Sequence, residues 1–302
     1  MRPRGCVVAI AILTLGSCRD NGASRTDSTR GSLPPVFPAS PLASTSWDRE
    51  AGPLMIVATT GGDTAAVVLP EATDSSITSF QGISPPIAGL TFDLFDRRGK
   101  MESSVSLSAL PGADSTADCY SWPRAKVHTT ASWRVGFVSN KVVAVKVDSI
   151  ESLSSPDSAS LAAAITQTAA TLPAAADPAF RGLPFRVRSA YSFTLDSVAV
   201  VIADVVRSVN EEANPRIEHL TIIGERAAGS RGKFDAAYSK RSAGAEEATQ
   251  VTDILAIVEI GREKRPVVVV GIETEDGGRV GLIERVSPGR WTLVWTSAYT
   301  DC

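Results

Sequence analysis

Short runs of β-forming residues separated by turn signals fill most of this chain, and they constrain its fold more than any other feature. Three pairs of runs flank short polar loops: 54–59 and 64–69, 90–95 and 103–107, and 133–138 and 142–147. Strands joined by so few residues pair as antiparallel hairpins, because parallel neighbours need a crossover of about a dozen residues or more. The sequence therefore predicts a mainly β fold of antiparallel hairpins and meanders.

The second half of the chain continues this pattern with longer apolar strands. They are expected at residues 197–206, 218–224, 234–239, 254–260, 267–274, 280–286 and 291–296. Two sets of these strands resemble each other at a spacing of about 50 residues, since one contains Ile222-Ile223-Gly224-Glu225 and the other Val269-Val270-Gly271-Ile272. This layout is typical of propeller blades and also of ordinary meanders. The pattern therefore leaves a β-sandwich and a propeller-like arrangement open.

The hairpin at residues 267–286 is apolar on both faces. One face carries Val267, Val269, Leu282 and Val286, and the other carries Val268, Val270, Ile272 and Ile283. Strands that are buried on both sides show such continuous apolar runs. We expect this hairpin to lie in the middle of the fold, covered on both sides.

A single Ala-rich helix is expected near the middle of the chain. Ser155 can cap it, Pro156 suits its first position, and Pro173 ends it. Its apolar stripe consists of Leu161, Ile165, Ala169 and Leu172. The organisation predicted for the folded part is an N-terminal β region over 47–155, a helix and linker over 156–178, and a C-terminal β-meander region over 179–302.

The first 18 residues have the order of an export signal. Arg2 and Arg4 precede an uncharged apolar stretch that ends in Leu15-Gly16-Ser17-Cys18. The stretch is about half the length needed to span a bilayer. The run resembles the lipobox of bacterial lipoproteins. The resemblance implies that residues 1–17 are a signal peptide and that Cys18 is acylated. The acyl chains would anchor the protein to a membrane of the bacterial envelope, with the folded part facing the periplasm or the outer surface. An ordinary secreted protein is the alternative.

Residues 19–46 are predicted to be a disordered tether between the anchor and the folded part. They contain four Pro, six Ser, three Thr and two Gly, a composition that buries too little apolar surface to offset the entropy of ordering. The whole chain has a net charge of −3, and loss of Arg2 and Arg4 makes it more acidic. No basic stripe overrides this balance, so a nucleic-acid partner is not expected.

The sequence offers no motif that names a reaction or a cofactor. His128 and His219 are 91 positions apart and no Cys pair is closely spaced, which argues against zinc. Ser230 and Lys233 match a Ser-x-x-Lys pattern, but they lie in a predicted Gly-rich loop where a helix would be required. Glu273 and Glu284 are expected on one face of their hairpin, about 13 Å apart, which exceeds the separation in glycosidase carboxylate pairs.

The C-terminal meander also has a family likeness. It is similar to repeats of the FG-GAP and VCBS kind. In place of their Asp-x-Asp-x-Asp-Gly calcium loop this chain has only Glu275-Asp276-Gly277-Gly278. The resemblance therefore carries no metal site to this chain.

Trp291 and Trp295 are four residues apart on one strand, so both are expected to face the same way. They are either core residues or an exposed platform for a ligand. A disulfide is expected between Cys119 and Cys302, because cleavage removes Cys6, acylation consumes Cys18, and exported cysteines usually pair.

The sequence thus predicts a lipid-anchored bacterial envelope protein with a binding or structural role and no cofactor. Its partners would be the membrane, through the acyl chains on Cys18, and an envelope protein or cell-wall ligand. The alternative is an envelope hydrolase, which clustered carboxylates or a Ser/His pair in a deep pocket would favour.

Overall fold

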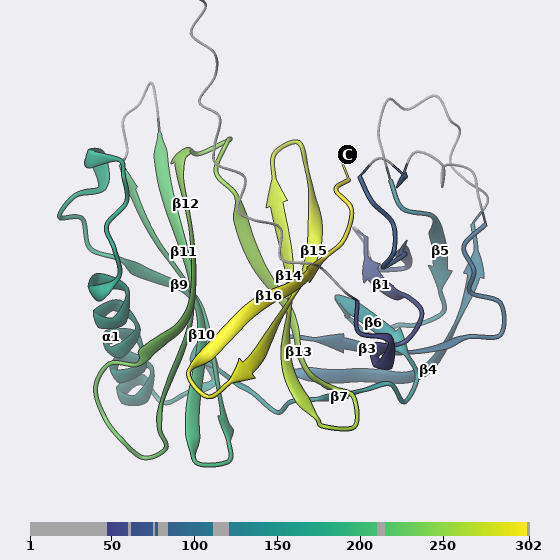
Figure 1. The fold of residues 1–302 in the computed structure, drawn as a ribbon, viewed down its shortest axis with the longest axis horizontal. Helices are drawn as coiled ribbons and strands as arrows, with labels where there is room; N and C mark the ends of the chain where they lie inside the picture. The colour runs from purple at the N-terminus through teal and green to yellow at the C-terminus, as the bar shows by residue number, and fades with distance from the viewer. Residues whose placement is uncertain are drawn as a thin grey trace, which may run out of the picture. The chain divides into compact units, whose positions relative to one another are not determined.

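The structure is a computed structural model that describes residues 47–59, 62–74, 76–77, 84–110, 121–209 and 215–300. All of these belong to one compact unit, Leu42–Cys302. They form three antiparallel sheets and one α-helix (Figure 1), which confirms the mainly β fold class. In the described part of the chain, no helix is both long and apolar enough to cross a membrane.

The first sheet closes on itself as a six-stranded barrel in the order β1-β2-β5-β4-β3-β6, seen at the right of Figure 1. Its strands are β1 (Met55–Ala58), β2 (Thr64–Val68), β3 (Thr91–Asp96), β4 (Gly99–Ala109), β5 (Arg124–Val127) and β6 (Val135–Val138). The barrel closes because β6 pairs with both β1 and β3. Apolar side chains fill its interior so tightly that a Cβ on Gly136 would come within 2.7 Å of Ile56.

Two five-stranded sheets follow. The inner sheet has the order β16-β15-β14-β13-β7, and the outer sheet has the order β12-β11-β10-β9-β8. The inner strands are β7 (Val142–Ala144), β13 (Val251–Ile260), β14 (Arg265–Thr274), β15 (Gly277–Ser287) and β16 (Arg290–Thr296). The outer strands are β8 (Asp148–Ser149), β9 (Arg186–Leu195), β10 (Val198–Val209), β11 (Arg216–Ala227) and β12 (Asp235–Ala245). Each sheet is therefore a four-strand meander with one short strand added from an earlier part of the chain.

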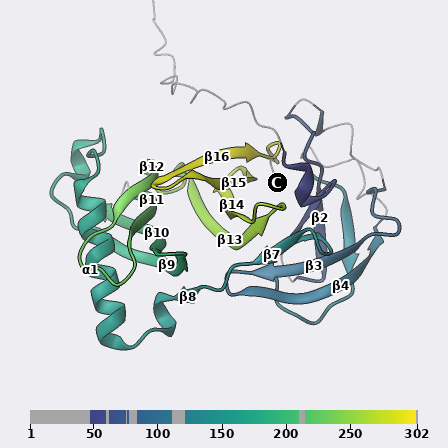
Figure 2. The same cartoon turned by 60° about the horizontal axis from the view of Figure 1, so that its bottom comes forward.

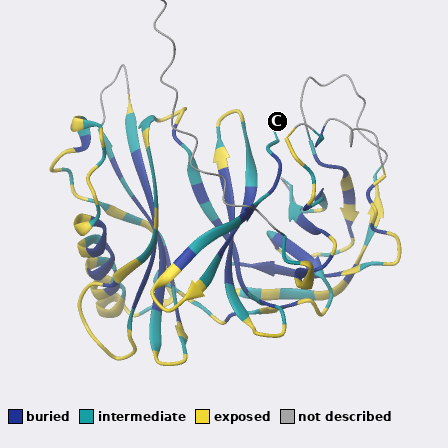
Figure 3. Cartoon of the chain, in the orientation of Figure 1, coloured by how far each residue is buried: buried dark blue, intermediate teal, exposed yellow. Residues whose placement is uncertain are grey.

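Apolar cores join these elements into successive layers. One core lies between the barrel and the inner sheet, a second lies between the inner and outer sheets, and a third lies between the outer sheet and α1 (Ser155–Thr171). In Figure 3 the central strands are mostly buried, and the exposed residues gather on turns and on the outer side of the helix. The two stacked sheets are a β-sandwich, so of the two expected arrangements the described residues form the sandwich and not a propeller.

The hairpin β14–β15 is covered on both sides, as predicted. Val267, Val269 and Leu282 belong to the core shared with the barrel, whereas Val268, Val270 and Ile283 belong to the core shared with the outer sheet. Val286, expected on the first face, is instead 45% exposed, because the pairing of β15 with β16 is irregular near that residue.

The helix also follows its prediction closely. Leu161, Ile165 and Ala169 are buried against the outer sheet, and Leu172 packs beside them. The cap is Ser154, one residue before the expected Ser155, and its hydroxyl accepts from the backbone N–H of Asp157. Three short 3-10 turns, at Arg49–Ala51, Ile150–Ser152 and Pro178–Phe180, complete the helical elements described here.

One expected hairpin is wrong. Residues 133–138 and 142–147 do not pair with each other: β6 stays in the barrel, while β7 pairs with β13 of the inner sheet. Figure 2 shows the chain leaving the barrel at this point for the two sheets. Since β7 and β8 both precede residue 156, the sheets cross the expected boundary between the N-terminal and C-terminal β regions.

Candidate functional site

A groove of about 1020 Å³ lies where the barrel packs against the inner sheet. It exceeds the upper end of the range typical of small-molecule sites. Its floor is apolar and belongs to the core between these two layers: Val57, Ala66, Val68, Trp122, Leu255 and Val280. The barrel supplies one wall through β1, β2, β5 and the 130–134 segment, and the hairpin β14–β15 supplies the other.

Charged side chains of both signs line the groove. The barrel wall presents Arg124 and Arg134, and the hairpin wall presents Glu273 and Glu275. Within the described chain, Arg124, Glu273 and Glu275 form no ion pair, so their charges face solvent in the groove. The hairpin wall also bears Arg279, which lies 3.6 Å from Asp74 and over the ring of Tyr299.

The wall of the groove is fixed by an ion cluster around Asp253. Arg97 donates two hydrogen bonds to its carboxylate, at 2.5 and 2.6 Å, and Arg134 donates one at 2.8 Å. Burial disfavours the charge on Arg97, but Asp253 more than compensates and raises the pKa of Arg97 above its ordinary value. Arg97 lies in the turn between β3 and β4 and Arg134 lies next to β6, whereas Asp253 is on β13, so the cluster ties the barrel to the inner sheet beside the groove.

The structure separates Trp291 and Trp295, which were expected to share a face. The pairing of β15 with β16 shifts between Leu293 and Trp295, so an extra residue in β16 turns the second indole to the opposite side. Trp291 lies in the core between the two sheets, and Trp295 lies in the core beside the barrel. Both are buried, with exposed fractions of 3% and 1%. They therefore form no common exposed platform.

The cysteine predictions lie outside the described residues. This applies to the lipidation site Cys18 and to both members of the expected disulfide, Cys119 and Cys302. The signal peptide and the tether fall outside as well.

The residues examined for catalysis do not converge on one another. The β14–β15 turn consists of Glu275 and Asp276, two positions from its expected register. This places Glu273 and Glu284 six positions apart along the strands, or about 20 Å. Glu284 instead pairs with Arg265.

The two histidines have separate surroundings. His219 is buried beside Asp204, with Nδ1 3.2 Å from the carboxylate. Nε2 of the exposed His128 lies 2.7 Å from the hydroxyl of Ser108. No described carboxylate orients this Ser/His pair, and neither residue lines a hollow described here. No group of three or more potential metal ligands occurs within the described ranges.

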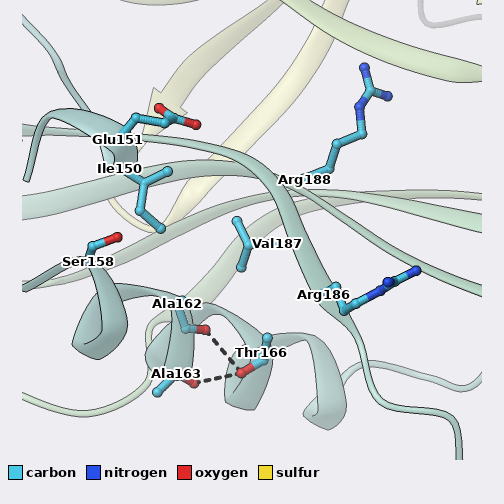
Figure 4. Close-up of a pocket in the computed structure, with 9 residues that line it drawn as sticks. All are labelled: Ile150, Glu151, Ser158, Ala162, Ala163, Thr166, Arg186, Val187 and Arg188. Atoms are coloured by element: carbon cyan, nitrogen blue, oxygen red, sulfur yellow. Dashed lines mark hydrogen bonds between the residues drawn. The ribbon is translucent and has the colours of Figure 1, made fainter. Parts of the chain in front are cut away.

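The described part of the chain also has smaller hollows. One of about 440 Å³ lies between α1 and β9 (Figure 4), where Thr166 bonds only to helix carbonyls and the side chain of Arg186 points away from Glu151. Another, of about 760 Å³, lies beside Trp47 and Pro70. A third, of about 470 Å³, lies at the C-terminal end of α1.

The groove was not anticipated from the sequence, because its walls come from segments far apart in the chain. Its sequence signals are scattered: a Trp and an Arg separated by Pro123, and two Glu at 273 and 275 on the N-terminal side of Asp276. Compared with known proteins, the chain matches no family model, no curated protein and no solved structure.

Proposed function

We propose that this chain is a lipid-anchored protein of the bacterial envelope that binds a ligand in the groove between the barrel and the inner sheet, without transforming it. The lipobox-like run ending at Cys18 supports the anchor and the location. The observation that carries the binding role is the groove itself: its floor is apolar, and Arg124 on one wall and Glu273 and Glu275 on the other have no ion-pair partner among the described residues. Convergent polar groups around an apolar hollow are the usual form of a binding site.

The opposed charges favour a ligand that carries both signs. Arg124 and Arg134 suit carboxylates, whereas Glu273 and Glu275 suit an ammonium group. The floor around Trp122 suits the aliphatic part of the same ligand. A short peptide with several carboxylates and one amine has this chemistry, and the stem peptides of the bacterial cell wall are of this type. We therefore propose a cell-wall stem peptide as the ligand.

The binding proposal is tested by calorimetric titration of the full chain in a nonionic detergent with the synthetic N-acetylated tripeptide L-Ala-D-Glu-meso-diaminopimelate, which has three carboxylates and one amine. Arg124→Ser and Glu273→Gln should each weaken binding by about tenfold, the effect of losing one charged hydrogen bond. Arg290→Ser and Glu263→Gln remove the same charges from exposed positions away from the groove and should change affinity less than about twofold. Equal affinity in all four variants, or no binding at millimolar peptide, would contradict the proposal.

The anchor is tested separately by Cys18→Ser. Without the thiol no acyl chain can be attached, so the variant should remain unprocessed or become soluble on cell fractionation, whereas the natural chain should sediment with membranes. Normal processing and equal membrane attachment of the variant would overturn the lipid anchor and leave the groove proposal standing.

A further inference from the structure

A second candidate site lies on the far side of the outer sheet from the groove. It is the hollow of about 470 Å³ at the C-terminal end of α1, bounded by the helix, residues 182–185 and the strands β10 and β12. Its walls are largely apolar: Ala169, Ala170, Leu172, Leu183, Pro184 and Phe185. Among the described residues that line it, Arg207 and Arg241 are the only ionisable ones, and none is acidic.

These two arginines share one carboxylate. Arg207 donates from Nε to Glu218 Oε2 at 2.7 Å, and Arg241 pairs with the other oxygen of Glu218. The side chain of Glu218 is fully buried and that of Arg207 is 91% buried, since its exposed fraction is 9%. The cluster therefore holds one positive charge in excess. Burial lowers the pKa of both arginines, and for Arg241 the charge of Arg207 lowers it further.

The remaining contacts hold the guanidinium groups in place but do not use all of their donors. Arg207 Nη1 donates to Leu183 O, and Arg241 Nη2 donates to Pro173 O. The ring of Phe185 lies 4.5 Å from Arg207 Cζ and 5.9 Å from Arg241 Cζ, as in cation–π pairs. No described group accepts from Arg207 Nη2 or Arg241 Nε.

We propose that this hollow binds the carboxylate of a small organic acid with an apolar substituent. The single excess positive charge matches a monoanion, and the two unused donor nitrogens, Arg207 Nη2 and Arg241 Nε, can donate to its oxygens. The apolar walls can cover a short aliphatic or aromatic tail. This site is independent of the groove, from which the outer and inner sheets separate it.

The test is calorimetric titration of the full chain, in a nonionic detergent, with sodium hexanoate. Acetate lacks the tail, hexanol lacks the charge and inorganic phosphate carries an additional charge, so each should bind at least about tenfold more weakly than hexanoate. Equal binding of hexanoate and hexanol would show that the arginines play no part. Equal binding of hexanoate and phosphate would show that the hollow does not select a monoanionic carboxylate.

A variant that leaves the ion cluster intact separates binding from folding. Ala170 is exposed and lines the hollow, so Ala170→Phe should fill it and weaken hexanoate binding at least about tenfold. Ala159→Phe places the same side chain on an exposed helix position away from the hollow and should leave binding unchanged. Arg241→Lys keeps the charge but loses the planar donor geometry, and it should weaken binding as well. Unaltered hexanoate affinity in Ala170→Phe would overturn the proposal.

Discussion

At the scale of single residues, Glu225 shows how one side chain can join two sheets. It lies on β11 of the outer sheet and is 6% exposed. Its carboxylate accepts two hydrogen bonds from Arg285, at 2.8 and 2.9 Å, one from the backbone N–H of Gly289 at 2.9 Å and one from Trp291 Nε1 at 2.6 Å. All four donors belong to the end of the inner sheet. The sequence marks Glu225 only as the last residue of an apolar run and does not reveal these partners.

Removing this charge should destabilise the protein. Glu225→Gln keeps the shape but cannot accept all four hydrogen bonds and leaves Arg285 without its counter-ion. We expect the free energy of unfolding at pH 7 to fall by about 3 kcal/mol, as for other broken buried ion pairs. Denaturant unfolding measures this change, with the exposed Glu247→Gln as a control that should alter stability by less than about 0.5 kcal/mol.

The difference in free energy of unfolding between the natural protein and Glu225→Gln should also depend on pH. Burial by itself would raise the pKa of Glu225, but the bonds from Arg285, Gly289 and Trp291 outweigh it and hold the pKa below its ordinary value. A depressed carboxylate pKa contributes stability above the unfolded-state value of about 4.3, and this contribution is lost as the pH falls through the folded-state value. The difference between the natural protein and Glu225→Gln should therefore shrink below about pH 4. A difference that stays constant down to pH 2 would contradict this assignment.

At the scale of elements, local patterns predict what local interactions determine. Tight turn signals correctly predict β1–β2 and β14–β15, and the caps and apolar stripe correctly predict α1. The failures have non-local causes. Strand β6 leaves its sequence neighbour β7 because barrel closure gives it two other partners. The irregular pairing of β16 turns Trp295 away from Trp291, and a fixed two-residue period cannot reveal such a bulge.

Helix α1 is attached to the outer sheet by a polar contact that periodicity does not predict. The hydroxyl of Thr168 is buried, donates to Ala164 O at 2.9 Å and accepts from the backbone N–H of Phe234 at 3.0 Å. Thr168→Val keeps the shape but leaves that N–H buried without a partner. We expect a loss of about 1–3 kcal/mol in the free energy of unfolding.

A matched variant is available on the same helix. The hydroxyl of Thr166 bonds only to the helix carbonyls of Ala162 and Ala163, so Thr166→Val should change stability by less than about 0.5 kcal/mol. Chemical denaturation of the two variants compares them directly. Equal effects would mean that the contact between Thr168 and Phe234 contributes nothing to attachment of the helix.

At the scale of the whole molecule, the groove depends on contacts between distant parts of the chain. Arg97 and Asp253 are 156 positions apart, and Arg134 and Asp253 are 119 apart. Hydropathy and spacing describe neighbours along the chain, so no pattern in the sequence indicates that these side chains meet. For this reason the sequence predicts the fold class and the central hairpin, while the groove emerges only when the barrel and the inner sheet pack together.

The predicted disulfide belongs to this scale as well. Cys119 and Cys302 lie outside the described residues. The described residue nearest to Cys302 is Thr300, which lines the groove. The one nearest to Cys119 is Ser121, whose neighbour Trp122 lines the groove as well. Thr300 is held there by a bridge to Gly278, and Tyr299 by a bond to Asp74. The described segments nearest in sequence to the two cysteines therefore both border the groove, and the pairing of the cysteines stays a prediction.

The bond would close a loop of more than 180 residues and link Cys302 to the segment between β4 and β5. The chain-entropy model gives such a loop about 5 kcal/mol of stabilisation, an upper figure because native-state strain lowers it. Thiol titration of the exported protein, denatured without reductant, should find neither Cys119 nor Cys302 reactive. Reduction, or Cys302→Ser, should lower the melting temperature. Two reactive thiols in the unreduced protein, or a melting temperature that reduction leaves unchanged, would show that the two cysteines are not paired. The described contacts of Tyr299 and Thr300 would then hold this segment at the groove without a disulfide.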